Sequence, residues 1–331
     1  MRSSARRGSL LCALLTAVAV ALGPCGAAAQ PYPTRPITMI VPFAAGGSAD
    51  AVARIVADGM ATPLGQPVVI ENDGGASGTI GMGRAVRAAA DGYTLCFGSW
   101  ASHVVNAGVR ALPFDVRNDF APVSLIASNP LVIVARKGLP ASDLKGLIAW
   151  LKANPNKALL GTAGAGSASN LAGIFFEKLT GTQLRHVPYR GLGFAMQDLV
   201  AGRIDMIIDL TANALPQVRA GTVSAYAITA DTRLASAPDI PTADAAGVPG
   251  LDVSVWQGLW APKQTPKPII DRLDAAVVAA LAEPQVRRRL TDLGQAIFPR
   301  AQQTPEGLRA YHAAEIAKWW PLIKAEHIRP D

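Results

Sequence analysis

The feature that most constrains the fold is the alternation of short β-rich runs with helical patterns. The run Ile37 to Val41 is apolar, and the apolar residues that follow it recur at the spacing of one helix face: Val52, Ile55, Val56 and Met60. Further strands are predicted at Val68 to Ile70 and Tyr93 to Gly98, with a helix near Ala85 to Ala90 between them. Such alternation is typical of parallel sheets covered by helices.

A second series of the same kind begins after Pro122 and Pro130. It predicts a helix over Leu144 to Leu151 with Ser142 as N-cap, and another over Leu171 to Leu179. The predicted strands are Leu131–Ala135, Ala158–Leu160, Arg185–Val187, Ile204–Ile208 and Ala225–Thr229. A proline-rich stretch, residues 238–249, and two C-terminal helices follow, the last starting at Thr304-Pro305.

The length of the chain favours two lobes. The chain has 331 residues, of which about 300 follow residue 29, and half of its composition is apolar. A chain of this size can bury a large core and favours two lobes over one. We expect an α/β fold in which each lobe is a mostly parallel sheet covered by helices. Lobe 1 would comprise residues 30–127 and 227–331, and lobe 2 residues 128–226. The strand at Ala225 would return the chain to lobe 1, and two lobes imply a cleft.

Residues 1–29 have the pattern of a secretory signal. Arg2, Arg6 and Arg7 precede an uncharged, mostly apolar run from Leu10 to Leu22, and small residues follow up to Ala29-Gln30. The thirteen-residue run is shorter than the roughly 17–25 residues of a membrane-spanning helix. We therefore expect cleavage near Ala29-Gln30 and a periplasmic location. Lipidation at Cys25 and twin-arginine export are weaker alternatives.

Charge and cysteine content exclude several classes of protein. The net charge of +7 falls to +4 without residues 1–29, and no Lys/Arg stripe of a nucleic-acid reader is present. Cys96 is then the one remaining cysteine, so neither an intrachain disulfide nor a cysteine-rich metal cage is expected. We expect no metal and no cofactor.

Two glycine-rich turns, each between a predicted strand and helix, are the strongest candidates for a binding site. The first is Phe43-Ala44-Ala45-Gly46-Gly47-Ser48 with Asp50, and the second contains Gly164-Ala165-Gly166-Ser167. Glycine lets a ligand approach the backbone closely, and a helix N-terminus offers unpaired N–H groups and a partial positive charge. Two such turns facing each other would hold a carboxylate without any Arg or Lys.

Other chemistries match the sequence poorly. Gly161 and Gly166 have the spacing of a nucleotide-binding P-loop, but Ser167 stands where a lysine is required. No Gly-x-Ser-x-Gly or His-Glu-x-x-His motif occurs, and no histidine has metal-ligand spacing to another. His103 stands out because it follows a strand end, the edge where α/β sheets bind ligands.

Several motifs in a fixed order resemble one family, the Bug-type extracytoplasmic solute receptors of tripartite tricarboxylate transporters. The resemblance covers nearly all of the chain after residue 29. It rests on Tyr32-Pro33-x-Arg35-Pro36-Ile37, Val41-Pro42-Phe43, Leu64-Gly65-Gln66-Pro67-Val68-Val69, Gly78-x-Ile80-Gly81, Asp91-Gly92-Tyr93-Thr94, Asp119-Phe120-Ala121-Pro122-Val123, Val187-Pro188-Tyr189-x-Gly191 and Asp239-Ile240-Pro241-Thr242.

The resemblance implies a periplasmic-binding-protein, or Venus-flytrap, fold with a ligand carboxylate held between the two turns. It also implies a transporter membrane permease as the partner. The lobes would close on the ligand about hinges near residues 127 and 227. We therefore expect a binding protein and not an enzyme. A sensor for a membrane kinase is an alternative, and an exported enzyme with His103 or Asp209 as base is a weaker one.

The chain departs from the family at the wall of the pocket. Asn170 stands where many members have histidine, and Leu210-Thr211-Ala212 follows Asp209 where Asn-Leu-Pro is more usual. Asp209 could accept a hydrogen bond from a ligand or cap the next turn. Trp100 and Trp256 could stack an aromatic acid or pack in the core. Ser99 and Tyr189 are further candidate contacts, and the identity of the carboxylate stays open.

Overall fold

Ten strands and their connecting helices make up the computed structural model, which describes residues 32–328. The chain forms two units, Met1–Thr34 and Arg35–Asp331, and the fold below is that of the second. The predicted signal, residues 1–29, lies outside the described residues. In the part described, no helix combines the length and apolar character needed to cross a membrane.

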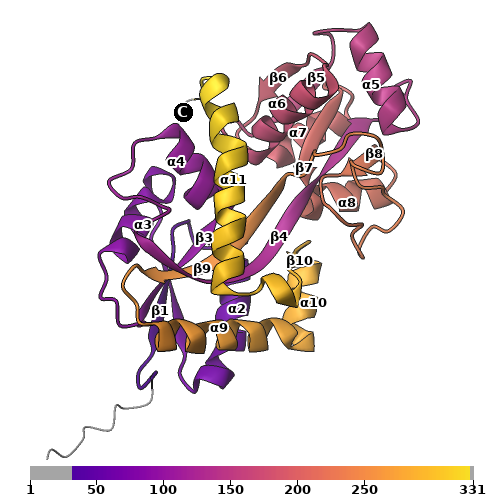
Figure 1. The fold of residues 1–331 in the computed structure, drawn as a ribbon. Coiled ribbons are helices and arrows are strands. Elements are labelled where there is room, and N and C mark those ends of the chain that lie inside the picture. Colours follow the sequence, from indigo (N-terminus) through magenta and orange to yellow (C-terminus); the bar gives the residue numbers. More distant parts are fainter. Residues whose placement is uncertain (1–31, 329–331) are drawn as a thin grey trace, which may run out of the picture. The chain divides into compact units, whose positions relative to one another are not determined.

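Strands and helices alternate along most of the chain (Figure 1). The strands are β1 (Ile37–Val41), β2 (Val68–Asn72), β3 (Thr94–Ser99), β4 (Phe120–Arg136), β5 (Leu159–Thr162), β6 (Arg185–Pro188), β7 (Met206–Leu210), β8 (Val223–Ile228), β9 (Ser254–Pro262) and β10 (Ala296–Ile297). The α-helices are α2 (Ser48–Leu64), α3 (Thr79–Val86), α4 (Asn106–Val109), α5 (Leu144–Ala153), α6 (Ala168–Thr180), α7 (Leu192–Val200), α8 (Thr211–Arg219), α9 (Lys267–Ala282), α10 (Pro284–Asp292) and α11 (Pro305–Ala325). Short turns are the 3₁₀ segments η1 (Ala76–Gly78) and η3 (Arg300–Gln302) and the π-helical η2 (Ala101–Val105).

The long strand β4 belongs to two sheet regions. Its first part, residues 120–130, pairs antiparallel with β9, which also pairs with β3; β1 joins β3 and β2 in parallel. Its second part, residues 131–136, pairs antiparallel with β7 and β8, and β5 joins β7 and β6 in parallel. The strand order is therefore β2-β1-β3-β9-β4-β7-β5-β6.

Each strand predicted from the sequence is present, and most lie within a few residues of their expected bounds, as do most predicted helices. The exception among the strands is Leu131–Ala135, which is only the second part of the 17-residue strand β4. The N-cap of α5 was predicted wrongly: Asp143, and not Ser142, accepts the Gly146 N–H at 2.7 Å. Thr304 does cap α11, accepting the Gly307 N–H. Three helices, α9, α10 and α11, follow the proline-rich stretch where two were expected.

The return of the chain to the first sheet differs from expectation. β8, the strand expected to make the crossing, pairs with the second part of β4, and β9 is the strand that pairs with β3. The sequence did not mark β9 because its nine residues are almost all buried and show no alternation. The lobe boundaries at residues 127 and 227 stay predictions.

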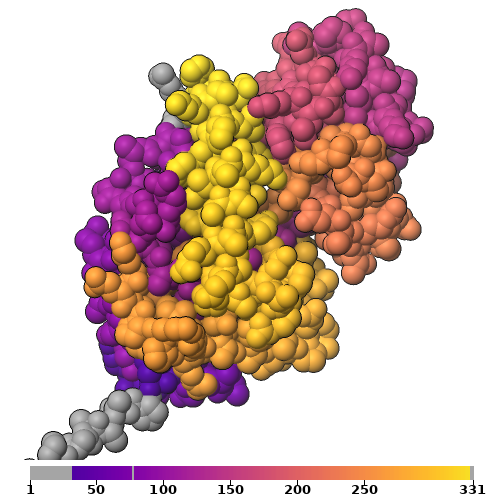
Figure 2. All heavy atoms as spheres, viewed as in Figure 1, coloured from indigo at the N-terminus to yellow at the C-terminus, as the bar shows by residue number. Residues whose placement is uncertain are grey.

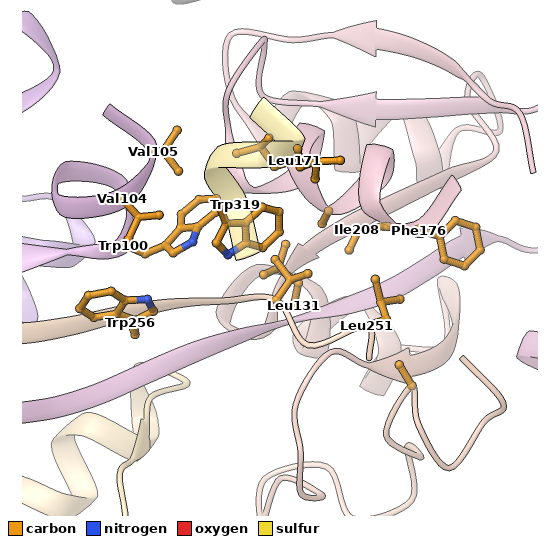
Figure 3. Packing of buried hydrophobic residues seen from close by; sticks show 14 of the residues in the cluster. Trp100, Val104, Val105, Leu131, Leu171, Phe176, Ile208, Leu251, Trp256 and Trp319 are labelled. Atoms are coloured by element: carbon orange, nitrogen blue, oxygen red, sulfur yellow. The ribbon is translucent and has the colours of Figure 1, made fainter. Parts of the chain in front are cut away.

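The C-terminal helix α11 joins the two sheet regions through apolar packing. Trp319 is fully buried, with Trp100 edge-on at 5.3 Å between ring centroids and Phe175 of α6 at 5.5 Å. Figure 3 shows Trp319 between Trp100 and residues of the second region such as Leu171. In the space-filling view α11, in yellow, runs along the face turned to the viewer (Figure 2).

We expect Gly98→Ala to destabilise the protein by about 2–4 kcal/mol. A Cβ at this position of β3 would lie 2.1 Å from His103 Cε1 and 2.6 Å from Trp260 Cζ3, and both rings are buried. Urea denaturation would measure the loss. Gly193→Ala is a matched control because nothing lies within 4 Å of its Cβ site in α7, so that variant should be at least as stable as wild type. Equal stability of the two variants would contradict the packing described here.

Candidate functional site

The first glycine-rich turn leaves the carboxyl end of β1 and enters α2. Gly46 has φ +79°, a conformation that favours glycine, and Gly47 is the N-cap of α2 with extended backbone. Residues 44–48 are exposed. Among residues 32–328, no protein group pairs with the backbone N–H of Ala45 or Ser48. The turn therefore presents free donors at the positive end of a 17-residue helix.

Asp50 stabilises this turn through hydrogen bonds. Its carboxylate accepts the Gly46 N–H at 2.9 Å, Arg54 Nε at 3.1 Å and Asn72 Nδ2 at 3.0 Å. The side chain is buried; burial opposes ionisation, but the bonds from Arg54, the Gly46 N–H and Asn72 outweigh it and lower the pKa of Asp50. The carboxylate is thus committed to the turn, a different role from the ligand contact predicted for it.

The second turn leaves the carboxyl end of β5 and enters α6 with the same geometry. Gly166 has φ +74°, and Ser167 is the N-cap, its Oγ accepting the Asn170 N–H at 3.2 Å. The Ser167 N–H bonds the Gly164 carbonyl, as the Gly47 N–H bonds that of Ala44. In the described part of the chain, the N–H groups of Ala165 and Ala168 have no protein partner.

Asn170 occupies the place in the second turn that Asp50 has in the first. Its Oδ1 accepts the Gly166 N–H at 3.1 Å, four residues before it. Its Nδ2 lies 3.1 Å from His186 Nδ1, and His186 Nε2 lies 2.8 Å from Glu177 Oε2. In the sequence, Asn170 stood out only as a departure from the family. The signal that could have revealed its role is the shared spacing of Gly46 to Asp50 and Gly166 to Asn170.

The remaining candidate contacts are spread over strand ends, and most have partners inside the protein. Ser99 is the last residue of β3 and Trp100 follows it; both are buried, and the Trp100 Nε1–H has no partner among the described residues. The Tyr189 hydroxyl donates to Asp198 at 2.9 Å. Trp256 packs against Tyr311 and donates its Nε1–H to Glu315, so this ring is part of the core.

Asp209 forms hydrogen bonds with residues at the start of α8, whose N-cap residue is Leu210. It is 1% exposed, and it accepts the Leu210 N–H at 2.7 Å and a bond from Asn213. Burial raises the pKa of Asp209 to about 6, although the bonds from Asn213 and the Leu210 N–H act in the opposite direction. Of the two roles that the sequence allowed, this geometry supports the local one, because the carboxylate is hydrogen-bonded within the following turn.

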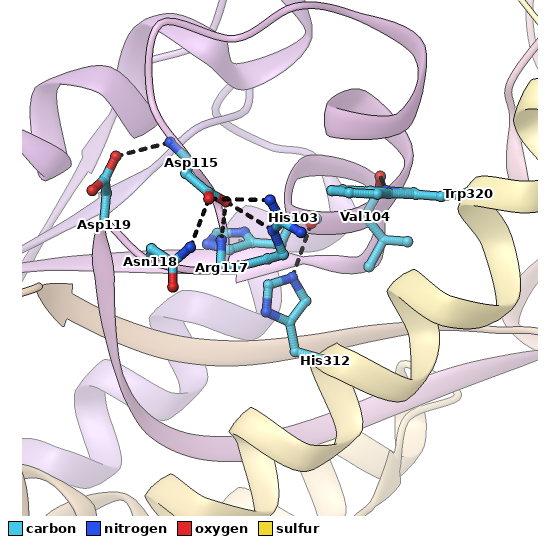
Figure 4. Close-up of polar contacts among 8 residues, drawn as sticks. All are labelled: His103, Val104, Asp115, Arg117, Asn118, Asp119, His312 and Trp320. Atoms are coloured by element: carbon cyan, nitrogen blue, oxygen red, sulfur yellow. Dashed lines mark hydrogen bonds and ion pairs between the residues drawn. The ribbon is translucent and has the colours of Figure 1, made fainter.

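His103 points into the core and not toward the sheet edge. Its ring stacks on Trp260 at 3.9 Å between centroids and is fully buried. Burial, together with nearby His312, holds the pKa of His103 well below its usual range. Figure 4 shows His312 reaching from α11 to the carbonyl of His103, a 3.0 Å hydrogen bond. A buried, neutral imidazole of this kind cannot exchange protons with a substrate in a cleft.

Metal and thiol chemistry find no support in the part of the chain that the structure describes. Within residues 32–328 no group of three or more His, Cys, Asp or Glu side chains could hold a metal ion. Cys96 is fully buried in β3, and burial raises the pKa of its thiol to about 12. The arrangement is suited to binding through backbone donors.

The proteins similar to this chain include a receptor family and periplasmic binding proteins. The family model described as "Tripartite tricarboxylate transporter family receptor" matches residues 52–328. A relative from Agrobacterium vitis, named for the TAR-I ttuE-ttuC' intergenic region, is 40% identical over 292 residues, covering 88% of this chain and 84% of the relative.

Two solved structures are similar over nearly their whole length. The periplasmic binding protein BugD is 38% identical with a TM-score of 0.71, covering 91% of this chain and 100% of BugD. MatC from Rhodopseudomonas palustris, solved with bound malate, is 39% identical with a TM-score of 0.71. The match covers 88% of this chain and 100% of MatC. The fold of this chain is the two-lobed α/β fold of periplasmic solute-binding proteins.

We expect Asp209→Asn to stabilise the protein at neutral pH but not in acid. Because the pKa is raised from 3.8 to about 6, the folded state keeps a proton here that the unfolded chain has released. Stability is therefore lost as the pH rises through this window, by up to about 3 kcal/mol above pH 6. Urea denaturation at pH 7.5 and pH 4 would measure the difference.

The control for this prediction is Asp239→Asn, which changes an exposed carboxylate. It should alter stability little at either pH. An Asp209→Asn effect of equal size at pH 4 and pH 7.5 would show that the buried charge is not its cause.

Proposed function

The chain belongs to the receptor family of tripartite tricarboxylate transporters, and from this premise we propose that it captures a small carboxylate between its two glycine-rich turns and delivers it to a membrane permease. The observation that carries the proposal is the matching geometry of the turns. Each follows a parallel strand, has a left-handed glycine at position 46 or 166, and presents unpaired N–H groups at a helix start. Backbone donors in a helix's first turn favour anions.

The turns supply the anion site, and other groups determine which anion fits. The two helix ends recognise a carboxylate group without reading the rest of the ligand. Malate is bound in MatC, so a di- or hydroxycarboxylate is the class of ligand to test first. Ser99 and Trp100, at the carboxyl end of β3, and Tyr189, after β6, are the side chains that we assign to the pocket wall.

Closure of two lobes would bring the turns together. We assign residues 128–226 to the second lobe, with hinges near residues 127 and 227; the first lies where β4 runs from its pairing with β9 toward its pairing with β7 and β8. A ligand shifts the equilibrium toward the closed form only through a higher affinity for that form, which the second helix end provides. The closed form would be the one that a permease receives after export of the protein.

Catalysis is not part of the proposal. An enzyme acting on the bound acid would need an accessible base, and the two groups considered for it, His103 and Asp209, are buried with partners in the protein. Stoichiometric binding without product is therefore the expected behaviour. Detection of turnover of a bound acid by the purified protein would contradict this part of the proposal.

A thermal-shift screen of the protein purified after export tests the ligand class. We expect one class among mono-, di- and tricarboxylates, amino acids and aromatic acids to raise the melting temperature. At a concentration of 100 Kd the added stability is about 2.7 kcal/mol, a shift of roughly 3–6 °C for a chain of this size. No shift with any carboxylate would refute the proposed ligand class.

We expect Gly47→Asp and Gly166→Asp each to lower the affinity for that ligand by about 100-fold or more. A like charge placed against the anion costs several kcal/mol. Gly47 has an ordinary φ and its Cβ site meets only the Ala44 carbonyl at 3.4 Å, so that variant should fold. Gly47→Ala is the matched control and should lose much less affinity, as measured by calorimetry. Wild-type affinity in a folded Gly47→Asp protein would show that this turn does not hold the anion.

A further inference from the structure

The hydrogen-bond chain behind the second turn fixes the proton positions along it. Because Asn170 Oδ1 accepts the Gly166 N–H, its Nδ2 must face His186 Nδ1 as a donor. His186 Nδ1 is then the acceptor, and Nε2 carries the proton that it donates to Glu177 Oε2. Glu177 is itself held by the Leu184 N–H at its other oxygen. This arrangement of donors and acceptors requires a neutral His186 imidazole.

Protonation of His186 would break this pattern at one point. A proton on Nδ1 faces the Asn170 amide nitrogen, and two donors repel each other. The Asn170 amide relieves the conflict by reversing, which places its oxygen toward the ring. Its NH₂ group and the Gly166 N–H then both face the turn and require an acceptor. An anion in the turn can accept both bonds.

We propose that Asn170 is a positioning residue whose amide orientation follows the protonation of His186, so that acid adds hydrogen-bond donors to the second turn and strengthens anion binding there. The inference rests on the proposed function for its effect on affinity, but the amide reversal itself does not need a ligand. Anion binding and protonation must favour each other reciprocally, because the two events are thermodynamically linked.

The groups that contact the His186 ring come from α6, from β5 and from its own strand. From α6, Glu177 and Asn170 meet its two nitrogens, and Gly173 lies close enough that its Cβ site is 3.1 Å from His186 Cε1. From β5, Leu160 is its cross-strand neighbour. Arg185 on its own strand is exposed, and β6 ends the strand order of the sheet.

The first turn is an internal control because its acceptor cannot reverse. Asp50 has no N–H to present, and its two oxygens are held by the Gly46 N–H, Arg54 and Asn72. The donors of the first turn should therefore not change with the protonation of any imidazole. The two turns share one backbone geometry. A difference in their response to pH would therefore come from the side chain four residues after the glycine, Asp50 or Asn170.

The test is an NMR titration of ¹⁵N-glycine-labelled protein without ligand, from pH 8 to pH 5.5. We expect the Gly166 amide shift to move with the same midpoint as the His186 ring, while the Gly46 amide shift stays constant. The His186→Gln variant, which cannot gain a proton, should abolish the Gly166 movement. Asn170→Asp is the matched variant: it gives the second turn the acceptor of the first, and Gly166 should again stay constant.

Three outcomes would overturn the proposal: a Gly166 amide that is constant while the His186 ring titrates, a ring that does not titrate in this range, or a Gly166 shift that persists in His186→Gln. Malate then serves as the probe for the effect on affinity. If it binds, we expect binding about three- to tenfold tighter at pH 5.5 than at pH 8, and a pH effect under twofold in His186→Gln. Absence of malate binding would count against malate as the ligand of the proposed function and would leave the result of the titration standing.

Discussion

The passage of β4 through two sheet regions is the constraint on which the rest of the structure depends. Residues 120–130 complete the sheet that contains β1 and β3, and residues 131–136 complete the one that contains β5 and β7. One strand thus sets the direction of the parallel strands on both sides. The carboxyl ends of β1 and β5, where the two turns lie, follow from this pairing. Any movement of one region against the other must bend β4 or the segments beside it.

In the proposed site the binding chemistry comes from the backbone, and side chains hold the backbone in place. Each turn uses a glycine at positive φ to aim free N–H groups outward, and the fourth residue after it, Asp50 or Asn170, accepts the glycine's own N–H. The two acceptors differ in one respect. Asp50 carries a charge that Arg54 balances, whereas Asn170 is neutral and connects to His186. The turns match in shape but differ in their response to protons.

Buried polar groups in this protein mostly serve the fold. His103 and Asp209 were candidates because they stand near strand ends in the sequence, and Trp256 because its ring could stack an aromatic acid; each is buried. His103 stacks on Trp260, Asp209 accepts the Leu210 N–H just before α8, and Trp256 donates to Glu315. A strand end places a residue at the right edge of the sheet, but the pleat and the neighbouring helix decide whether its side chain faces the cleft or the core. The spacing of residues along the sequence does not determine which way such a side chain faces.

The sequence by itself determined the α/β alternation and most of its strands, the position of both glycine-rich turns and the family, because these depend on local periodicity, glycine placement and motif order. It did not determine that β9 and not β8 rejoins β3, that α11 packs between the two regions through Trp319, or that Asn170 meets His186 and Glu177. Those features are contacts between residues distant in the chain. They arise from which buried surfaces fit together, and only the tertiary structure decides that fit.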